Sequence, residues 1–140
     1  MAAANDIKLC NPENQVKPMI KDILRLIRPK QWIKNMFVFI PMFFAGELFD
    51  LHSLYLCAVT FLAYSLMASS IYCYNDIVDA DADRRHPVKC HRPVASGAVS
   101  VRLAYTLMAF LAALSVAVVL LLPPEVMANV LAVVLFYYLL

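Results

Sequence analysis

The sequence predicts an all-α protein, a polytopic transmembrane helical bundle with three full spans and part of a fourth. Hydrophobic residues make up 63% of the 140 residues and charged residues only 16%, whereas soluble domains have roughly 45–50% and ~25%. Two runs, of 25 and 22 residues, contain no Asp, Glu, Lys or Arg. Basic residues gather in alternate connections between the apolar runs. This composition excludes a disordered chain, a charged coiled coil and a nucleic-acid-binding arm.

The first apolar run, 35–46, has only 12 residues without an acidic or basic side chain. A helix that crosses the ~30 Å hydrocarbon core needs about 20 apolar residues. The run reaches that length if Trp32 and Ile33 lie in the membrane interface and Lys34 extends its ammonium group out of the bilayer. We therefore expect a first span that begins before residue 35.

The next two runs, 51–75 and 103–124, are long enough to span without such help. A fourth run, 126–140, has 15 residues and continues to the last residue without a cap, a glycine or a basic anchor. Helices usually show such a stop signal. We therefore expect the chain to end inside a fourth helix.

The distribution of basic residues predicts the orientation. The chain before residue 35 and the loop 84–102 are basic, whereas the connections 47–50 and 123–125 contain no Lys or Arg. Cytoplasmic loops carry the excess of Lys and Arg. The N-terminus and the loop 76–101 are thus predicted to be cytoplasmic. The basic residues that decide this are Lys8, Lys17, Lys21, Arg25, Arg28, Lys30, Lys34, Arg84, Arg85, Lys89, Arg92 and Arg102.

A group of carboxylates follows the second long run. If the helix continues, its rotation of about 100° per residue places Asp76, Asp79 and Asp83 on one face, with Asn75 at the edge and Asp81 pointing away. Three carboxylates where a helix enters the bilayer are costly without a cation. Mg²⁺ is usually held by one or two carboxylates together with substrate phosphates. The stripe therefore predicts a magnesium site, and the alternative is a hydrophilic stop with surface ion pairs.

Basic residues come directly after the acids. Arg84 and Arg92 offer planar guanidinium groups to phosphate oxygens, and Lys89 offers a compact point charge. Acids that hold a metal followed by bases that hold phosphate are the parts of a diphosphate site. The alternative is that these bases only keep the loop on the cytoplasmic side, and we expect both to be true.

Two motifs carry a resemblance to a known family. Two motifs taken together resemble those of the UbiA superfamily of intramembrane prenyltransferases. The first is the aspartate motif Asn75-Asp76-x-x-Asp79-x-x-x-Asp83, and the second, given below, lies in the loop that follows it. An earlier segment and the run Asp83-Arg84-Arg85-His86-Pro87 resemble the decaprenyl-phosphate phosphoribosyltransferase branch. The second motif and the earlier segment are, in order, Lys89-x-x-Arg92-Pro93-x-Ala95-Ser96-Gly97 and Leu26-Ile27-Arg28-Pro29-Lys30-Gln31-Trp32-Ile33-Lys34-Asn35.

The resemblance implies a helical bundle, usually of nine spans, whose polar cavity opens to the cytoplasm of a bacterial plasma membrane. It implies Mg²⁺ and a diphosphate-bearing donor, with Asp76, Asp79 and Asp83 as the metal-binding and catalytic residues. The substrate-binding residues implied are Asn75, Lys89, Arg92, Arg84 and, as candidates for the donor or acceptor phosphate, Lys30, Lys34 and Asn35. The last three have an alternative role, anchoring at the interface beside Trp32.

In the branch that the earlier segment resembles, phosphoribose passes from phosphoribosyl diphosphate to a polyprenyl phosphate, a membrane lipid. One alternative is prenyl transfer from a polyprenyl diphosphate to an aromatic acceptor, and another is a non-enzymatic membrane half-domain or inactive fragment. On this interpretation 1–22 is a polar cytoplasmic tail, and 23–140 is the N-terminal part of a transferase domain about twice as long. The second aspartate motif is then expected on a missing C-terminal half or on a partner.

Overall fold

The computed structural model describes residues 20–139, with side chains to residue 136. The basic residues Lys8 and Lys17 and most of the predicted tail lie outside the described residues. Within 20–139 the chain is helical and contains no strand. Its elements are α1 (Ile20–Ile27), the 3₁₀-helix η1 (Pro29–Phe39), α2 (Ile40–Phe44), α3 (Leu51–Val78), α4 (Ala80–Arg84), the 3₁₀-helix η2 (Lys89–His91), α5 (Val101–Val119) and α6 (Pro124–Leu139).

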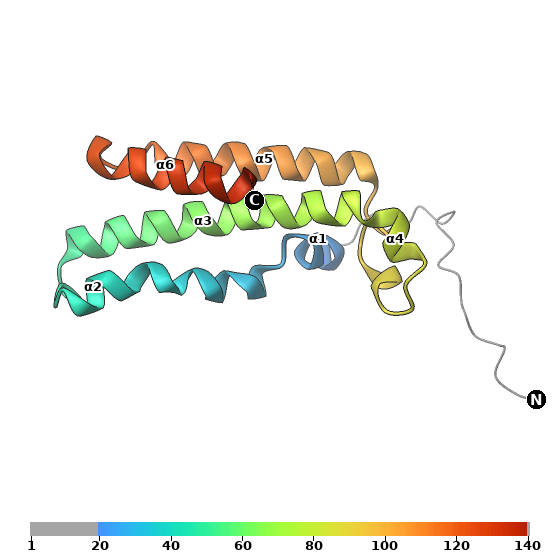
Figure 1. The fold of residues 1–140 in the computed structure, drawn as a ribbon, viewed down its shortest axis with the longest axis horizontal. Helices are drawn as coiled ribbons and strands as arrows, with labels where there is room; N and C mark the ends of the chain where they lie inside the picture. Colours follow the sequence, from blue (N-terminus) through green and yellow to red (C-terminus); the bar gives the residue numbers. More distant parts are fainter. Residues whose placement is uncertain (1–19, 140) are drawn as a thin grey trace, which may run out of the picture.

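The longest helix, α3, lies in the middle of the molecule (Figure 1). Helices α5 and α6 run along one side of α3, and η1 and α2 run along the other. Helix α1 lies across one end of α3, where α4 and the loop that follows it also gather. The connections from α2 to α3 and from α5 to α6 lie at the opposite end. The acids predicted to form the site are therefore at the end of the bundle that α1 covers.

Two of the predicted spans correspond to helices of the required length and composition. Helices α3, with 28 residues, and α5, with 19, are long and apolar enough to cross a membrane. Each begins at a side-chain cap: Asp50 Oδ2 accepts a hydrogen bond from the Ser53 amide at 2.8 Å, and Ser100 Oγ accepts one from the Leu103 amide at 3.3 Å. The bond from the Ser53 amide lowers the pKa of the Asp50 carboxyl below its ordinary value.

The first predicted span differs from the expectation. The run is not one long α-helix but η1 followed by the five residues of α2, and α6, with 16 residues, is also shorter than the two spans. Three full spans are therefore not shown. Part of the reason is Pro41, which has no N–H with which to bond the carbonyl of Phe37.

The 3₁₀ geometry of η1 also matches its partner helix. Trp32 Nε1 donates to Ser69 Oγ at 2.9 Å, and Asn35 Nδ2 donates to Ser65 Oγ at 3.1 Å. Residues i and i+3 of a 3₁₀-helix lie on one line and rise by about 6 Å, which is also the rise of about four residues in an α-helix. Three residues of η1 therefore cover the same length as four residues of α3. A hydrogen-bonded pair forms at each end of this length, Trp32 with Ser69 and Asn35 with Ser65.

Helices α3 and α5 form the most extensive contact in the bundle. Ser70 Oγ donates to the Met108 carbonyl at 2.9 Å, and Ser115 Oγ donates to the Ala63 carbonyl at 2.7 Å. Ser70, Ser115 and Ala63 are fully buried. Small residues let two backbones approach closely inside a membrane, and serine hydroxyls then bond across the contact. This packing makes α3 a rigid support for the acids at its end.

Candidate functional site

The acid stripe, defined as Asp76, Asp79 and Asp83, lies where α3 passes into α4. The helical hydrogen bonds continue through the junction, because the Asp79 amide bonds the Asn75 carbonyl at 2.9 Å and the Asp83 amide bonds the Asp79 carbonyl at 2.8 Å. The interruption between α3 and α4 is thus a single turn residue. The three carboxylates therefore share a face, as the spacing predicts, and Asn75 is exposed beside them.

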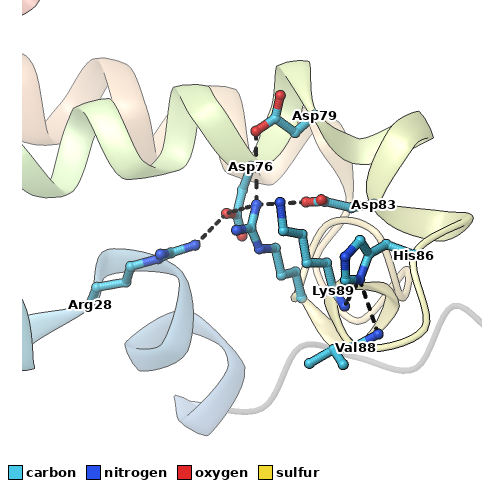
Figure 2. A network of polar contacts seen from close by, with 8 residues as sticks. Arg28, Asp76, Asp79, Asp83, His86, Val88 and Lys89 are labelled. Carbon is cyan, nitrogen blue, oxygen red and sulfur yellow. Dashed lines mark hydrogen bonds and ion pairs between the residues drawn. The ribbon is translucent and has the colours of Figure 1, made fainter.

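One guanidinium lies at the centre of the stripe. Arg92 Nη1 is 2.7 Å from Asp83 Oδ2 and 3.8 Å from both Asp76 Oδ1 and Asp79 Oδ2. The side chain of Asp76 is completely buried and that of Asp83 nearly so, whereas that of Asp79 is 54% exposed. In Figure 2 the dashed lines from the three labelled acids run toward one another at the end of the helix. The predicted phosphate contact Arg92 and the predicted metal ligands thus form one cluster.

The loop that carries Arg92 is held by its own motif. Arg92 follows η2 with extended backbone, and its carbonyl accepts a hydrogen bond from the Ser96 amide at 2.8 Å. Gly97 has a φ of 79°, a left-handed conformation that glycine adopts without steric cost. Val94 and Ala95, between them, are buried against the bundle. The loop therefore turns back on itself and presents Arg92 to the acids.

Arg28, which the motif analysis did not select as a site residue, completes the cluster. Its Nη2 donates to Asp76 Oδ1 at 2.8 Å, and its guanidinium lies 5.0 Å from the centre of the Tyr72 ring. Arg28 precedes Pro29, and residues before proline favour extended backbone. Instead its φ of 49° and ψ of 58° are left-handed. In the sequence, Arg28 was marked only as a basic residue before a proline, inside the segment 26–35 that resembles the phosphoribosyltransferase branch.

A short chain of hydrogen bonds holds Arg28 in place. The Ser69 hydroxyl donates to the carbonyl of Ile27 at 2.7 Å and accepts from Trp32 Nε1 at 2.9 Å. Leu26, just before this point, is fully buried. The residues on either side of Arg28 are thus fixed to α3, seven residues before Asp76.

Two other residues that were predicted to contact phosphate, Arg84 and Lys89, form no ion pair with the acid stripe. Arg84 turns away from the stripe, because its Nη1 pairs with Asp81 and its Nε donates to the Ala95 carbonyl at 3.3 Å. Asp81 lies off the shared face, as predicted. Figure 2 shows Lys89 extending from η2 toward the acids. Its ammonium is exposed and forms no ion pair with a carboxylate in the described part of the chain.

The three candidates on η1 lie farther from the acids. Lys30 is exposed and lines an open groove of 660 Å³ together with Arg28, and Lys34 is exposed on the same helix. Asn35 is bonded to Ser65 in the middle of α3 and lines a separate cavity of 170 Å³. The structure therefore does not bring Lys34 or Asn35 to the acid stripe.

The stripe as folded is a cluster of acids paired with arginines. Among residues 20–139 no group of three or more His, Cys, Asp or Glu side chains is placed so that it could hold a metal ion. One buried carboxylate oxygen, Asp76 Oδ2, has no hydrogen-bond partner among the described residues. An unpaired buried oxygen is costly, and a hydrogen-bond donor or a cation beside it would relieve that cost. Chemically, the cluster offers oxygen ligands beside fixed positive charges.

Several curated proteins are similar to this chain. The decaprenyl-phosphate phosphoribosyltransferase of Corynebacterium glutamicum is 39% identical over 107 residues, which are 75% of this chain and 31% of that protein. The enzyme of the same name from Mycobacterium tuberculosis is 38% identical over 103 residues, 71% of this chain and 34% of that protein. The 4-hydroxybenzoate octaprenyltransferase of Paracidovorax citrulli is 39% identical over 101 residues, 71% and 33%. The chain spans about a third of the length of the curated relatives that it matches.

The sequence pattern of the UbiA prenyltransferase family matches residues 35–140. This match contains the acid stripe and the loop that carries Arg92, whose contacts join the two motifs in space. It also contains the two helices that are apolar enough to cross a membrane. On these grounds the chain belongs to the UbiA prenyltransferase family.

Proposed function

We propose that this chain belongs to a membrane transferase that moves phosphoribose from phosphoribosyl diphosphate to a polyprenyl phosphate. The observation that carries the proposal is the convergence of Asp76, Asp79 and Asp83 on Arg92, with Lys89 alongside. A diphosphate donor needs a counter-charge for its leaving group, and this site concentrates ionic groups at the end of a membrane helix. The phosphoribosyltransferases among the relatives support the choice of donor.

We further propose that Mg²⁺ binds at the acid stripe. Asp76, Asp79 and Asp83 fit this ion by the chemistry of their oxygens, and the unpaired Asp76 Oδ2 is a buried position that a cation would satisfy. Bound there, the ion would neutralise negative charge on the leaving diphosphate. Arg92 and Lys89 would hold phosphate oxygens, and Asn75 would contact the donor at the edge of the stripe. Burial of Asp76 and Asp83 keeps water away from these charges, and the lower local dielectric strengthens their electrostatic interactions.

A third span is part of the proposal. The 11 residues of η1 rise by about 22 Å, and the five of α2 add about 8 Å. Their sum is close to the ~30 Å hydrocarbon core, so η1 and α2 together would cross the membrane beside α3. The N-terminus and the loop 76–101 would then be cytoplasmic, with the second aspartate motif on a further part of the protein or on a partner.

The test uses membranes that contain the complete protein. Radiolabelled phosphoribosyl diphosphate, polyprenyl phosphate and Mg²⁺ are supplied, and label in the organic extract is counted. We expect label in lipid, its loss on chelation by EDTA, and its loss in Asp79→Ala. The matched control is Asp81→Ala, two residues further along the chain, on α4 and off the shared face. Label that stays in the aqueous phase with every component present would refute the phosphoribosyl assignment.

A second candidate function is prenyl transfer to an aromatic acceptor, because one relative is a 4-hydroxybenzoate octaprenyltransferase that matches a similar share of the chain. The same membranes, given octaprenyl diphosphate and 4-hydroxybenzoate, would then yield a prenylated aromatic acid. A product in this assay and none in the first would select this function. No product in either assay would favour a non-enzymatic membrane half-domain.

A further inference from the structure

We propose that Arg28 is a displaceable counterion of Asp76, which leaves the carboxylate when a divalent cation binds the acid stripe. The inference rests on the proposed function, because it takes the stripe as the cation site. Its starting point is a conflict in the structure. The three acids have the composition of a cation site, yet the described residues contain no cluster arranged to hold one. The conflict arises because arginine nitrogens already occupy the approach to the carboxylates.

The two arginines are not equivalent. Arg92 is 2.7 Å from Asp83 and within 3.8 Å of the other two acids, so it keeps partners if it leaves any one of them. Arg28 pairs with Asp76 alone, at 2.8 Å through Nη2. Both act on the same oxygen, Asp76 Oδ1, while Oδ2 has no partner among residues 20–139. A cation that used both oxygens of Asp76 would therefore compete first with Arg28.

Three features favour the departure of Arg28. Its side chain is 30% exposed, so the guanidinium moves toward water and not into the core. The guanidinium already lies 5.0 Å from the centre of the Tyr72 ring, and a small movement away from the carboxylate can keep this cation–π contact. The backbone at Arg28 has a φ of 49°, the only positive φ of a non-glycine residue in the described part of the chain. Such strain persists only where the surroundings impose it, and it often occurs at switch positions.

The structure also contains a reporter of this change. Trp32 is the only tryptophan of the chain. Its Nε1 bonds Ser69 Oγ, and the same hydroxyl bonds the Ile27 carbonyl, one residue before Arg28. A change in the backbone at Arg28 therefore alters the hydrogen bond of the indole. Cation binding in the wild-type chain should change the fluorescence of Trp32.

The experiment measures Mg²⁺ binding to the full chain in detergent micelles by titration calorimetry, with Trp32 emission followed in parallel. Arg28→Gln removes the competing charge and should tighten Mg²⁺ binding by roughly tenfold. Arg28→Lys keeps the charge and should bind Mg²⁺ nearly as the wild type does. The matched control is Arg25→Gln, which makes the same change three residues earlier, on α1, at a side chain that is 58% exposed and lies 4.0 Å from Asp22.

The outcomes separate the inference from the proposed function. Displacement is supported by two results together. Arg28→Gln alone binds Mg²⁺ more tightly, and Mg²⁺ changes the Trp32 emission of the wild type but not of this variant. Equal or weaker binding in a folded Arg28→Gln overturns the inference while the metal site stands. If Arg28→Gln fails to fold, a wild-type Trp32 signal that does not respond to bound Mg²⁺ overturns it instead. Absence of Mg²⁺ binding in the wild type and in every variant would refute the metal site itself.

Discussion

The Arg92 guanidinium lies 2.7 Å from the Asp83 carboxylate. This contact joins two motifs that are separate in the sequence, because Asp83 ends the acid stripe and Arg92 belongs to the second motif, which begins at Lys89. The same Nη1 atom also reaches the other two acids. The loop and the end of α3 therefore form one electrostatic unit, and a change in either should affect both.

Removal of Arg92 should destabilise the protein. Arg92→Ala leaves Asp83 without its ion pair and Asp76 with Arg28 alone. Loss of one partner from a buried pair costs about 3–5 kcal/mol, and because the Arg92 side chain is 26% exposed we expect the lower part of that range or less, about 2 kcal/mol. Denaturant-induced loss of helical circular dichroism in micelles measures it. The matched control is Arg102→Ala, at an exposed arginine, and equal effects of the two changes would contradict the prediction.

Substitution of an acid in the stripe should reduce the transfer activity far more than substitution of the neighbouring Asp81. Asp76→Asn keeps the shape of the side chain but removes the buried charge, and we expect about a 100-fold loss of product in the transfer assay. Asp81→Asn, at a side chain that is 81% exposed, should change the rate by about twofold or less. Equal losses would show that the shared face has no special role. Helical content of both variants serves as the folding control.

At the contact between α3 and α5, removal of the Ser115 hydroxyl should destabilise the protein less than insertion of a larger side chain. Ser115→Ala removes the bond to the Ala63 carbonyl and should cost about 0.6 kcal/mol. Ser115→Leu forces a larger side chain into a fully buried position and should cost about 1–3 kcal/mol. Unfolding in mixed detergent micelles measures both. Thr106→Ala is the control, because Thr106 is exposed on α5 and bonds only the Arg102 carbonyl of its own helix.

The two ends of α3 should be accessible from opposite sides of the membrane. In a chain whose four native cysteines are replaced by alanine, Lys89→Cys should react with an impermeant maleimide from the cytoplasmic side. Phe49→Cys, at a position that is 96% exposed, should react only from the other side. Inside-out and right-side-out vesicles distinguish these cases. Labelling of both positions in the same vesicle type would refute the proposed orientation.

Much of the bundle follows from local properties of the sequence. The charge-free runs predicted α3 and α5, because a helix needs about 20 apolar residues to cross the hydrocarbon core of a bilayer. The shared face of Asp76, Asp79 and Asp83 followed from the helical rotation alone. Arg84, which was predicted to contact phosphate, pairs with Asp81 in an ordinary i, i+3 interaction. The same helical periodicity that predicted the stripe also predicts this pair.

The sequence by itself determined which segments are apolar helices and which acids face together, because both depend on residue spacing of one or two turns. Only the tertiary structure decided that Arg28, 48 residues before Asp76, would pair with it. That pairing depends on a left-handed residue before a proline and on Ser69, which fixes the chain on both sides of it. Tertiary contacts also decided the 3₁₀ form of η1, because the match in rise between Trp32–Asn35 and Ser65–Ser69 exists only when the two helices lie side by side.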